Sequence, residues 1–374
     1  MKGLASIQKR GKKFQYTISH TVNGKTQLIR KGGFSSEKEA SIAAAEIEVK
    51  LARGIVPYLT HVPFESYFKQ WVELYKVDVA HSTRLHYDYT ARAIEEHFGS
   101  TPLQKIKRDH YQSFLNKFGK GKSKETVQKV NSHIRSCLKY AVMDQIVPFD
   151  FTEGTKLHFT TPAKKPNDKY LDVKDSELLF NEIIKKLKDG LGYYILLLAL
   201  TSGLRYEELV GLTIDDFDFT SNTIDINKTW GYNNRMPKGF GPTKNENSNR
   251  TISIDNITMN AFKALFKTIK PNKEKLVFYS PTSKYKVISN TSTNKLLKKT
   301  LTRMGIKPIT VHELRHTHAS VLLSHGVSIY YVSNRLGHKD VDTTHKYYTH
   351  LTKELHEKDS KNTVAIFNNM KDKQ

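Results

Sequence analysis

The sequence predicts a multidomain protein that is mainly α-helical and carries small β-sheets. The chain has 374 residues, whereas one domain usually holds about 100–200. Hydrophobic residues make up 38% of it, which suits globular domains and not a disordered chain. Apolar residues recur mostly at helical spacing, and alternating strand-like runs are confined to short segments. We therefore expect two large domains and one smaller module.

Charge is the first indication of function. Sixty Lys and Arg stand against 37 Asp and Glu, a formal net charge of +23. Such an excess favours a polyanionic partner, with nucleic acid ahead of an anionic membrane surface. The single cysteine, Cys137, excludes an intrachain disulfide and suits a cytosolic protein. No signal peptide is visible, and the most apolar run, Tyr193–Leu200, is too short to span a bilayer. We expect a soluble, cytoplasmic protein without a membrane partner.

The N-terminal residues predict a small sheet covered by one helix. Phe14–Val22 alternates and is rich in β-formers, and Thr26–Arg30 is the expected returning strand. Asn23-Gly24 between them is a strong hairpin signal. A helix should follow, with Ser36 as its N-cap and an end near Ala52. This basic module is either a structural appendage or an accessory DNA-binding module, and we favour the second.

The next part of the chain predicts an all-helical domain. Aromatic residues recur at helical spacing in its first segment, and we expect them to form the core. Basic faces on the same helices are where DNA would lie. The expected helices cover residues 64–75, 82–98, 108–118 and 123–143. The Pro-containing stretch Phe159–Asp168 then predicts an interdomain linker.

Four short segments of the last domain carry residues suited to chemistry. In the first, TSGLR, a buried helix ends and another begins with Arg205. An arginine at a helix start faces the positive end of the helix dipole, so an anion should compensate it. Glu207 or Glu208 is one candidate, and a bound phosphate is the other.

The second segment is a long turn rich in Gly, Pro and Asn. It lies between strand-like Thr223–Ile226 and Thr251–Ile254 and contains Lys244. A lone lysine on a hairpin is ordinarily a solvated surface residue. Lys238 lies in the same turn and is an alternative to Lys244.

The third segment, TVHELRHTHAS, places His312 and Arg315 three residues apart and so on one helical face. A guanidinium fork beside an imidazole suits a phosphodiester. His312, Glu313 and His316 also spell HExxH, a zinc-metalloprotease motif. No third-ligand motif follows, and a chain this basic is an unusual peptidase, so we favour the phosphodiester.

The fourth segment runs from Ser328 to His350. A helix should end before Gly337, with His338 directly after this cap. The next helix carries Tyr347 and Tyr348. A surface tyrosine alone indicates nothing, but one that follows a post-helix histidine by ten residues is far more specific.

Together these segments resemble the tyrosine recombinases, also called the phage integrase family. The resemblance rests on TSGLR at 201–205, HELRH at 312–316, LGH at 336–338 and YTH at 348–350. The order and spacing of all four are more specific than any one. The helical block resembles the family's core-site-binding domain. The N-terminal module resembles, by pattern, the arm-site-binding domain of integrases of Gram-positive phages and integrative elements.

The resemblance implies a catalytic set of six residues: Arg205, Lys244, His312, Arg315, His338 and Tyr348. The two arginines would bind the non-bridging oxygens of the scissile phosphate, where charge builds in the transition state. His312 would hydrogen-bond the phosphate or accept the nucleophile's proton, and His338 would act similarly from the opposite side.

The resemblance also implies a leaving-group acid and a nucleophile. Lys244 would protonate the leaving 5′ oxygen, and Tyr348 would attack phosphorus to form a 3′-phosphotyrosine. Tyr347 stays open as the nucleophile, because some family members place the tyrosine nine residues after the histidine. A free phenol has a pKa of about 10, and a strongly positive pocket favours its ionised form. The covalent link preserves the bond energy, so we expect neither a metal, nor ATP, nor any other cofactor.

The expected architecture has three parts. They are an α+β arm-binding module at 1–56, an all-α core-binding domain at 62–158, and a mainly-α tyrosine recombinase catalytic domain with a C-terminal tail at 169–374. The last two should form a clamp around double-stranded DNA, with four protomers acting as a homotetramer. We expect the tail, through Val364–Phe367, to pack on a neighbouring subunit, the alternative being its own domain. An excisionase and a DNA-bending host protein are partners that the sequence leaves open.

Two rival functions are less favoured. A cellular recombinase that resolves chromosome dimers would resemble the family's two-domain form, without the basic N-terminal module. A sequence-specific DNA-binding protein without catalysis would not require the full set of six residues.

Overall fold

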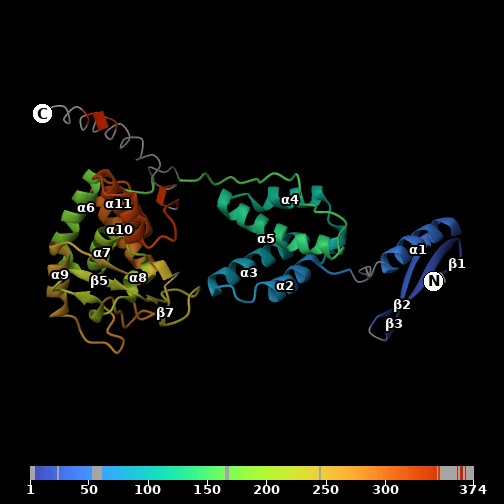
Figure 1. The fold of residues 1–374 in the computed structure, drawn as a ribbon, viewed down its shortest axis with the longest axis horizontal. Helices are drawn as coiled ribbons and strands as arrows, with labels where there is room; N and C mark the ends of the chain where they lie inside the picture. Colours follow the sequence, from blue (N-terminus) through green and yellow to red (C-terminus); the bar gives the residue numbers. More distant parts are fainter. Residues whose placement is uncertain are drawn as a thin grey trace. The chain divides into compact units, whose positions relative to one another are not determined.

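The computed structural model describes residues 5–22, 25–52, 61–164, 168–243, 246–342, 344–345, 360, 363–364 and 367. The chain forms two compact units, Met1–Ala163 and Lys164–Gln374, called here the N-terminal and C-terminal units. Figure 1 shows a sheet-and-helix module and a helical domain in the first, and a mainly helical body in the second. The predicted fold class is confirmed.

The N-terminal module is a three-stranded antiparallel sheet with one helix packed on it (Figure 1). Its elements are β1 (Ala5–Arg10), β2 (Lys13–Val22), β3 (Lys25–Phe34) and α1 (Glu37–Ala52). Ile18 pairs with Ile29 across β2 and β3 and, with Tyr16 and Ala44, forms the small core beneath α1. The sequence did not predict β1. The expected turn at Asn23-Gly24 lies outside the described residues.

The helical domain is built around the aromatic residues that the sequence placed in its core. Its helices are α2 (Phe64–Tyr75), α3 (His81–Phe98), α4 (Arg108–Phe118) and α5 (Lys124–Met143). Phe64, Phe68 and Trp71 of α2 are each at most 2% exposed. The Ser123 hydroxyl accepts a hydrogen bond from the Thr126 amide at 3.4 Å and caps α5, as the residue type favours. Cys137 is a fully buried core residue.

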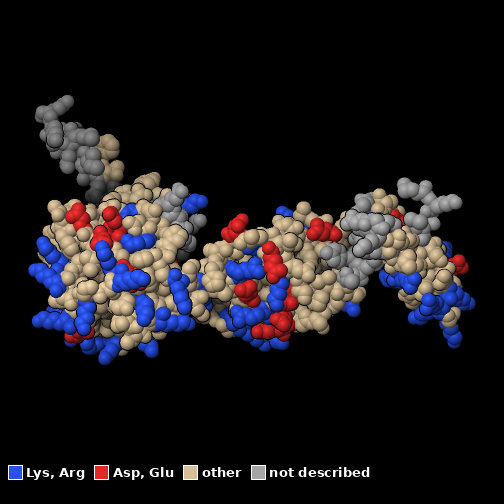
Figure 2. Space-filling view, turned by 90° about the horizontal axis from the view of Figure 1, so that it is seen from below, with Lys and Arg blue, Asp and Glu red and all other residues tan. Residues whose placement is uncertain are grey.

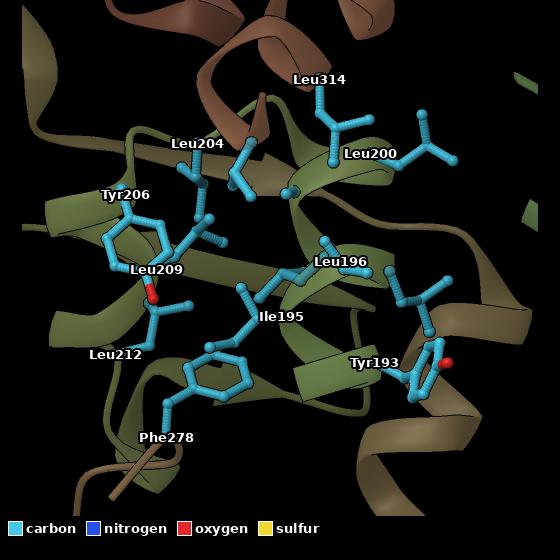
Figure 3. Packing of buried hydrophobic residues seen from close by; sticks show 14 of the residues in the cluster. Tyr193, Ile195, Leu196, Leu200, Leu204, Tyr206, Leu209, Leu212, Phe278 and Leu314 are labelled. Carbon is cyan, nitrogen blue, oxygen red and sulfur yellow. The ribbon is translucent and has the colours of Figure 1, made fainter. Parts of the chain in front are cut away.

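The C-terminal unit surrounds one apolar helix. Its helices are α6 (Val173–Lys185), α7 (Leu191–Ser202), α8 (Tyr206–Gly211), α9 (Asn256–Phe266), α10 (Asn290–Arg303), α11 (Val311–Ser324) and α12 (Ile329–Leu336). A helix that is apolar on all sides is buried on all sides, and residues 195–199 of α7 are each at most 1% exposed. Figure 3 shows Leu204, Leu209, Phe278 and Leu314 gathered around this helix.

A small sheet and a hairpin complete this unit. The strands β4 (Phe217–Asp218), β5 (Thr223–Ile226) and β8 (Arg250–Ser253) form an antiparallel sheet in that order. Between β5 and β8, β6 (Thr229–Trp230) and β7 (Phe240–Gly241) pair within the long turn. The strands β5 and β8 were predicted, whereas the two-residue strands were not.

Lysines and arginines spread over the visible face of the C-terminal unit, with acidic residues in few places (Figure 2). None of the described helices is long and apolar enough to cross a membrane. Most of the tail after Thr352 lies outside the described residues, and Val364 and Phe367 are 59% and 66% exposed. The packing of the tail on a neighbouring subunit stays a prediction.

Candidate active site

The structure brings four of the six predicted residues to one place in the C-terminal unit. Arg205 precedes α8, His312 and Arg315 lie on α11, and His338 follows α12. Hydrogen bonds to backbone carbonyls and the mutual electrostatic effects of these residues join them. Lys244 and both candidate tyrosines, Tyr347 and Tyr348, lie outside the described residues.

Two glycines end the helices that frame this place. Gly203 ends α7 at φ 68° and Gly337 ends α12 at φ 67°, a left-handed conformation that favours glycine. Neither position has room for a Cβ atom. A Cβ at residue 203 would lie 2.7 Å from the His318 ring, and one at residue 337 would lie 2.9 Å from Nη1 of Arg250. The TSGLR and LGH patterns therefore set helix ends at which side chains pack closely against backbone.

Arg205 has the anionic partner that its position at a helix start demands. Its Nη1 donates to Oε1 of Glu208 at 2.8 Å, and its amide donates to Oε2 at 2.9 Å. Nη2 of Arg250 donates to the same carboxylate at 3.0 Å. Burial favours the neutral acid, but the Arg250 and Arg205 guanidiniums outweigh it and lower the pKa of Glu208. The ionised carboxylate thus orients Arg205, whose side chain stays 18% exposed.

Arg315 joins the two glycine-capped helix ends. Its Nη1 donates to the Gly203 carbonyl at 2.8 Å, and its Nη2 donates to the Leu336 carbonyl at 2.6 Å. The residue is only 4% exposed. A guanidinium held from two sides in a buried place is preorganised for a charged ligand.

His312 is the more exposed of the two candidate imidazoles. Protein atoms crowd part of its ring and, with the guanidiniums of Arg315 and Arg205, lower its pKa below the usual value. Its ring also stands edge-on to that of His316, with the centroids 5.4 Å apart. The imidazole is therefore neutral near pH 7, and a neutral imidazole can accept a proton.

The His338 ring is held by a hydrogen bond to a residue that follows it closely in the sequence. Its Nδ1 lies 2.7 Å from the hydroxyl of Thr344, which is fully buried. Burial, followed by Arg315 and Arg205, lowers the pKa of His338 to about 4. It is therefore a second neutral imidazole beside the two arginines.

The HExxH pattern has a structural explanation in α11. Glu313 stands at the third position of the helix, and its Oε2 accepts from the Thr310 amide at 2.7 Å in a capping box. Its Oε1 accepts from Nζ of Lys164 at 2.7 Å. Among the described residues, no three His, Cys, Asp or Glu side chains are grouped as metal ligands.

Two further arginines belong to the same network, and the sequence did not predict a role for either. Arg250 opens β8, and its Nε donates to the Arg335 carbonyl at 2.7 Å. Arg335 in turn donates from Nε to His318 at 3.0 Å. Their partners are distant in the chain, so only the fold reveals these contacts.

Three family models match the chain. Residues 169–354 match the phage integrase family, 63–119 the N-terminal SAM-like domain of phage integrases, and 6–51 an arm DNA-binding domain. The chain belongs to the phage integrase family, the tyrosine recombinases. It is thus a site-specific DNA recombinase, and a DNA-binding protein without catalysis is not favoured.

Relatives of this recombinase come from a phage and from a bacterium. It is 28% identical to an integrase of Staphylococcus phage L54a, over 68% of this chain and 78% of the relative. It is 27% identical to a XerC-like tyrosine recombinase of Caldanaerobacter subterraneus, over 90% and 91% of the two chains.

Solved structures share the fold of this recombinase. The Tn1549 transposon integrase in complex with circular intermediate DNA superposes with a TM-score of 0.65 at 19% identity, over 77% of this chain and 95% of that one. A lambda integrase tetramer bound to a Holliday junction gives 0.56 at 14% identity, over 91% and 96%.

Proposed function

We propose that this recombinase cleaves and rejoins DNA through a 3′-phosphotyrosine link, and so integrates or excises a mobile element. The observation that carries the proposal is the meeting of two fixed guanidiniums and two neutral imidazoles at one place. Arg205 and Arg315 reach it from different helices, and His312 and His338 lie beside them. This arrangement suits a phosphodiester whose charge grows during attack.

The chemistry divides among the six residues. Tyr348 attacks phosphorus, its phenolic oxygen forms the new P–O bond, and the bond to the 5′ oxygen breaks. The phenol's proton passes to a neutral imidazole, and Lys244 protonates the leaving oxygen. Arg205 and Arg315 bind the non-bridging oxygens. Attack by the freed 5′ hydroxyl of a partner strand reverses these steps and restores the tyrosine.

The DNA and protein partners follow from the domain organisation. We propose that residues 1–56 bind arm sites, that 62–158 bind core sites, and that 169–374 catalyse exchange within a homotetramer. The lambda integrase tetramer on a Holliday junction supports this assembly. The likeness to a staphylococcal phage integrase and to a transposon integrase supports a mobile element as the substrate. An excisionase and a DNA-bending host protein would bias the direction of exchange.

The proposal is tested by recombination in vitro. Two candidate attachment sites, taken from DNA flanking the gene, are placed on one plasmid with the purified protein. We expect recombinant junctions in EDTA without ATP. Arg315→Ala should abolish the junctions while the protein still shifts the site DNA in a gel. Junctions that require Mg²⁺ or ATP, or a wild-type protein that binds the sites and never recombines them, would contradict the proposal.

A further inference from the structure

The C-terminal end of α12 is an attachment point for three arginines. The carbonyl of Arg335 accepts from Nε of Arg250 at 2.7 Å, and that of Leu336 accepts from Arg315 at 2.6 Å. The carbonyl of Gly337 accepts from Nη2 of Arg205 at 3.1 Å. The last carbonyls of a helix lack partners within it and form the negative end of its dipole. Guanidinium donors therefore stabilise this helix end, and the helix end in turn orients the donors.

The Arg335 side chain ties this helix end to the rest of the unit. Its Nη1 donates to the Ser253 carbonyl at 2.9 Å, and its Nη2 donates to the Thr201 carbonyl at 3.2 Å. Its Nε donates to Nε2 of His318 at 3.0 Å. Three nitrogens of one planar group thus connect α12 to β8, α7 and α11, a geometry that a lysine ammonium cannot reproduce.

His318 is built to accept this bond. Its Nδ1 lies 2.9 Å from the Leu200 carbonyl. A carbonyl only accepts, so Nδ1 carries the proton and Nε2 is left as an acceptor. Burial lowers the pKa of His318 to about 3, so this tautomer persists at any working pH. Gly203 leaves room for the ring, because a Cβ there would lie 2.7 Å from it.

We propose that Arg335 is a positioning residue for strand cleavage. It fixes the carbonyls at the C-terminal end of α12 that accept hydrogen bonds from Arg205 and Arg315. The inference rests on the proposed function. Arg335 orients α12 through its own side chain, and the helix end then orients both phosphate-binding arginines together. His338 directly follows the same helix end. A displacement of α12 would therefore move three catalytic groups at once, and misplacement by 1 Å can cost about 100-fold in rate.

The test separates cleavage rate from DNA affinity. Arg335→Lys keeps the charge and loses the planar set of donors. We expect its single-turnover cleavage of a nicked suicide substrate, at saturating protein, to fall by about 10- to 100-fold. Its DNA affinity, measured by fluorescence anisotropy, should stay within about 2-fold, because DNA binding is spread over many phosphate contacts. Arg303→Lys is the matched control, since Arg303 forms a surface ion pair with Glu182 in the same unit.

A chemical-rescue arm distinguishes positioning from a general loss of structure. Added ethylguanidinium should restore part of the cleavage by Arg335→Ala and leave Arg303→Ala unchanged. His318→Phe should add little further loss to Arg335→Lys, because both remove the same link. Wild-type cleavage rates in a folded Arg335→Lys protein would overturn the inference. So would parallel losses of affinity, melting temperature and rate without rescue. A wild-type protein that binds its site without cleaving it would instead overturn the proposed function.

Discussion

Glu208 balances two guanidiniums at the candidate active site. It is 1% exposed and bonds to both Arg205 and Arg250. Removing one partner of a buried ion pair leaves the other charge buried without compensation. Glu208 is therefore a structural counter-charge for Arg250 and for Arg205, which we propose binds the phosphate, and both stability and rate should depend on it.

Glu208→Gln should lower the free energy of unfolding by about 3 kcal/mol. Urea denaturation of the variant and the wild type measures the difference. Asp215→Asn removes the same charge from an ion pair with Lys275 whose side chains are 64% and 61% exposed. This control should change the free energy by about 1 kcal/mol or less. Equal effects of the two substitutions would contradict the role given to Glu208.

Three histidines whose pKa values are strongly lowered make stability depend on pH. Burial lowers the pKa of His316 and His338 to about 4 and that of His318 to about 3. In the unfolded chain each titrates near pH 6.5. Between these values the unfolded state binds more protons, so stability falls as the pH falls from about 6.5 towards 4. The pKa values of Glu208 and Glu313 are lowered, so these groups reduce stability only below about pH 4.5, their unfolded value.

The urea midpoint of the recombinase should therefore be lower at pH 5 than at pH 7. His318→Asn should reduce this difference, since it removes the most strongly shifted group. A midpoint that is constant or rises on acidification would show that these imidazoles are accessible and protonated in the folded protein.

At the scale of elements, the end of α12 matters most. Gly337→Ala and Gly326→Ala both place a side chain at positive φ, at 67° and 82°, which costs roughly 1–2 kcal/mol in each case. At residue 326 the new Cβ meets nothing within 4 Å, whereas at 337 it meets Arg250 and Ser248. We expect Gly337→Ala to lose more stability than Gly326→Ala because of these contacts, and only Gly337→Ala to lose cleavage, by about 10-fold or more. Equal cleavage rates would show that the close packing at 337 does not position the site.

Elements with strong local signals could be predicted from the sequence. Aromatic residues at helical spacing predicted α2, and Gly203 and Gly337 predicted the ends of α7 and α12. The strands β4, β6 and β7 hold two residues each, so they have no period to detect and depend on pairing with distant partners. The same limit hid the role of Arg250, whose carboxylate partner Glu208 lies 42 residues away. Of the six residues expected in the site, the four that lie in or beside helices are close together in the structure. Lys244 and Tyr348 stay predictions.

At the scale of the whole molecule, the modular organisation predicts separable DNA contacts. Deleting residues 1–56 should leave cleavage of an isolated core site unchanged and weaken binding to DNA that carries both core and arm sites. The salt dependence of that binding should become shallower, because phosphate contacts are lost. Gel shifts across a salt series measure both effects. Unchanged binding to the two-site DNA would contradict an arm-binding role for the module.

The central claim is a covalent link between this recombinase and DNA through Tyr348. Wild type, Tyr348→Phe and Tyr347→Phe are each incubated with a nicked suicide substrate that carries the attachment site, and are then run in SDS. We expect a DNA-linked band of reduced mobility for wild type and Tyr347→Phe and none for Tyr348→Phe. Loss in Tyr347→Phe alone would keep the mechanism and correct the nucleophile. The absence of a covalent band from a wild-type protein that binds the site would contradict the account.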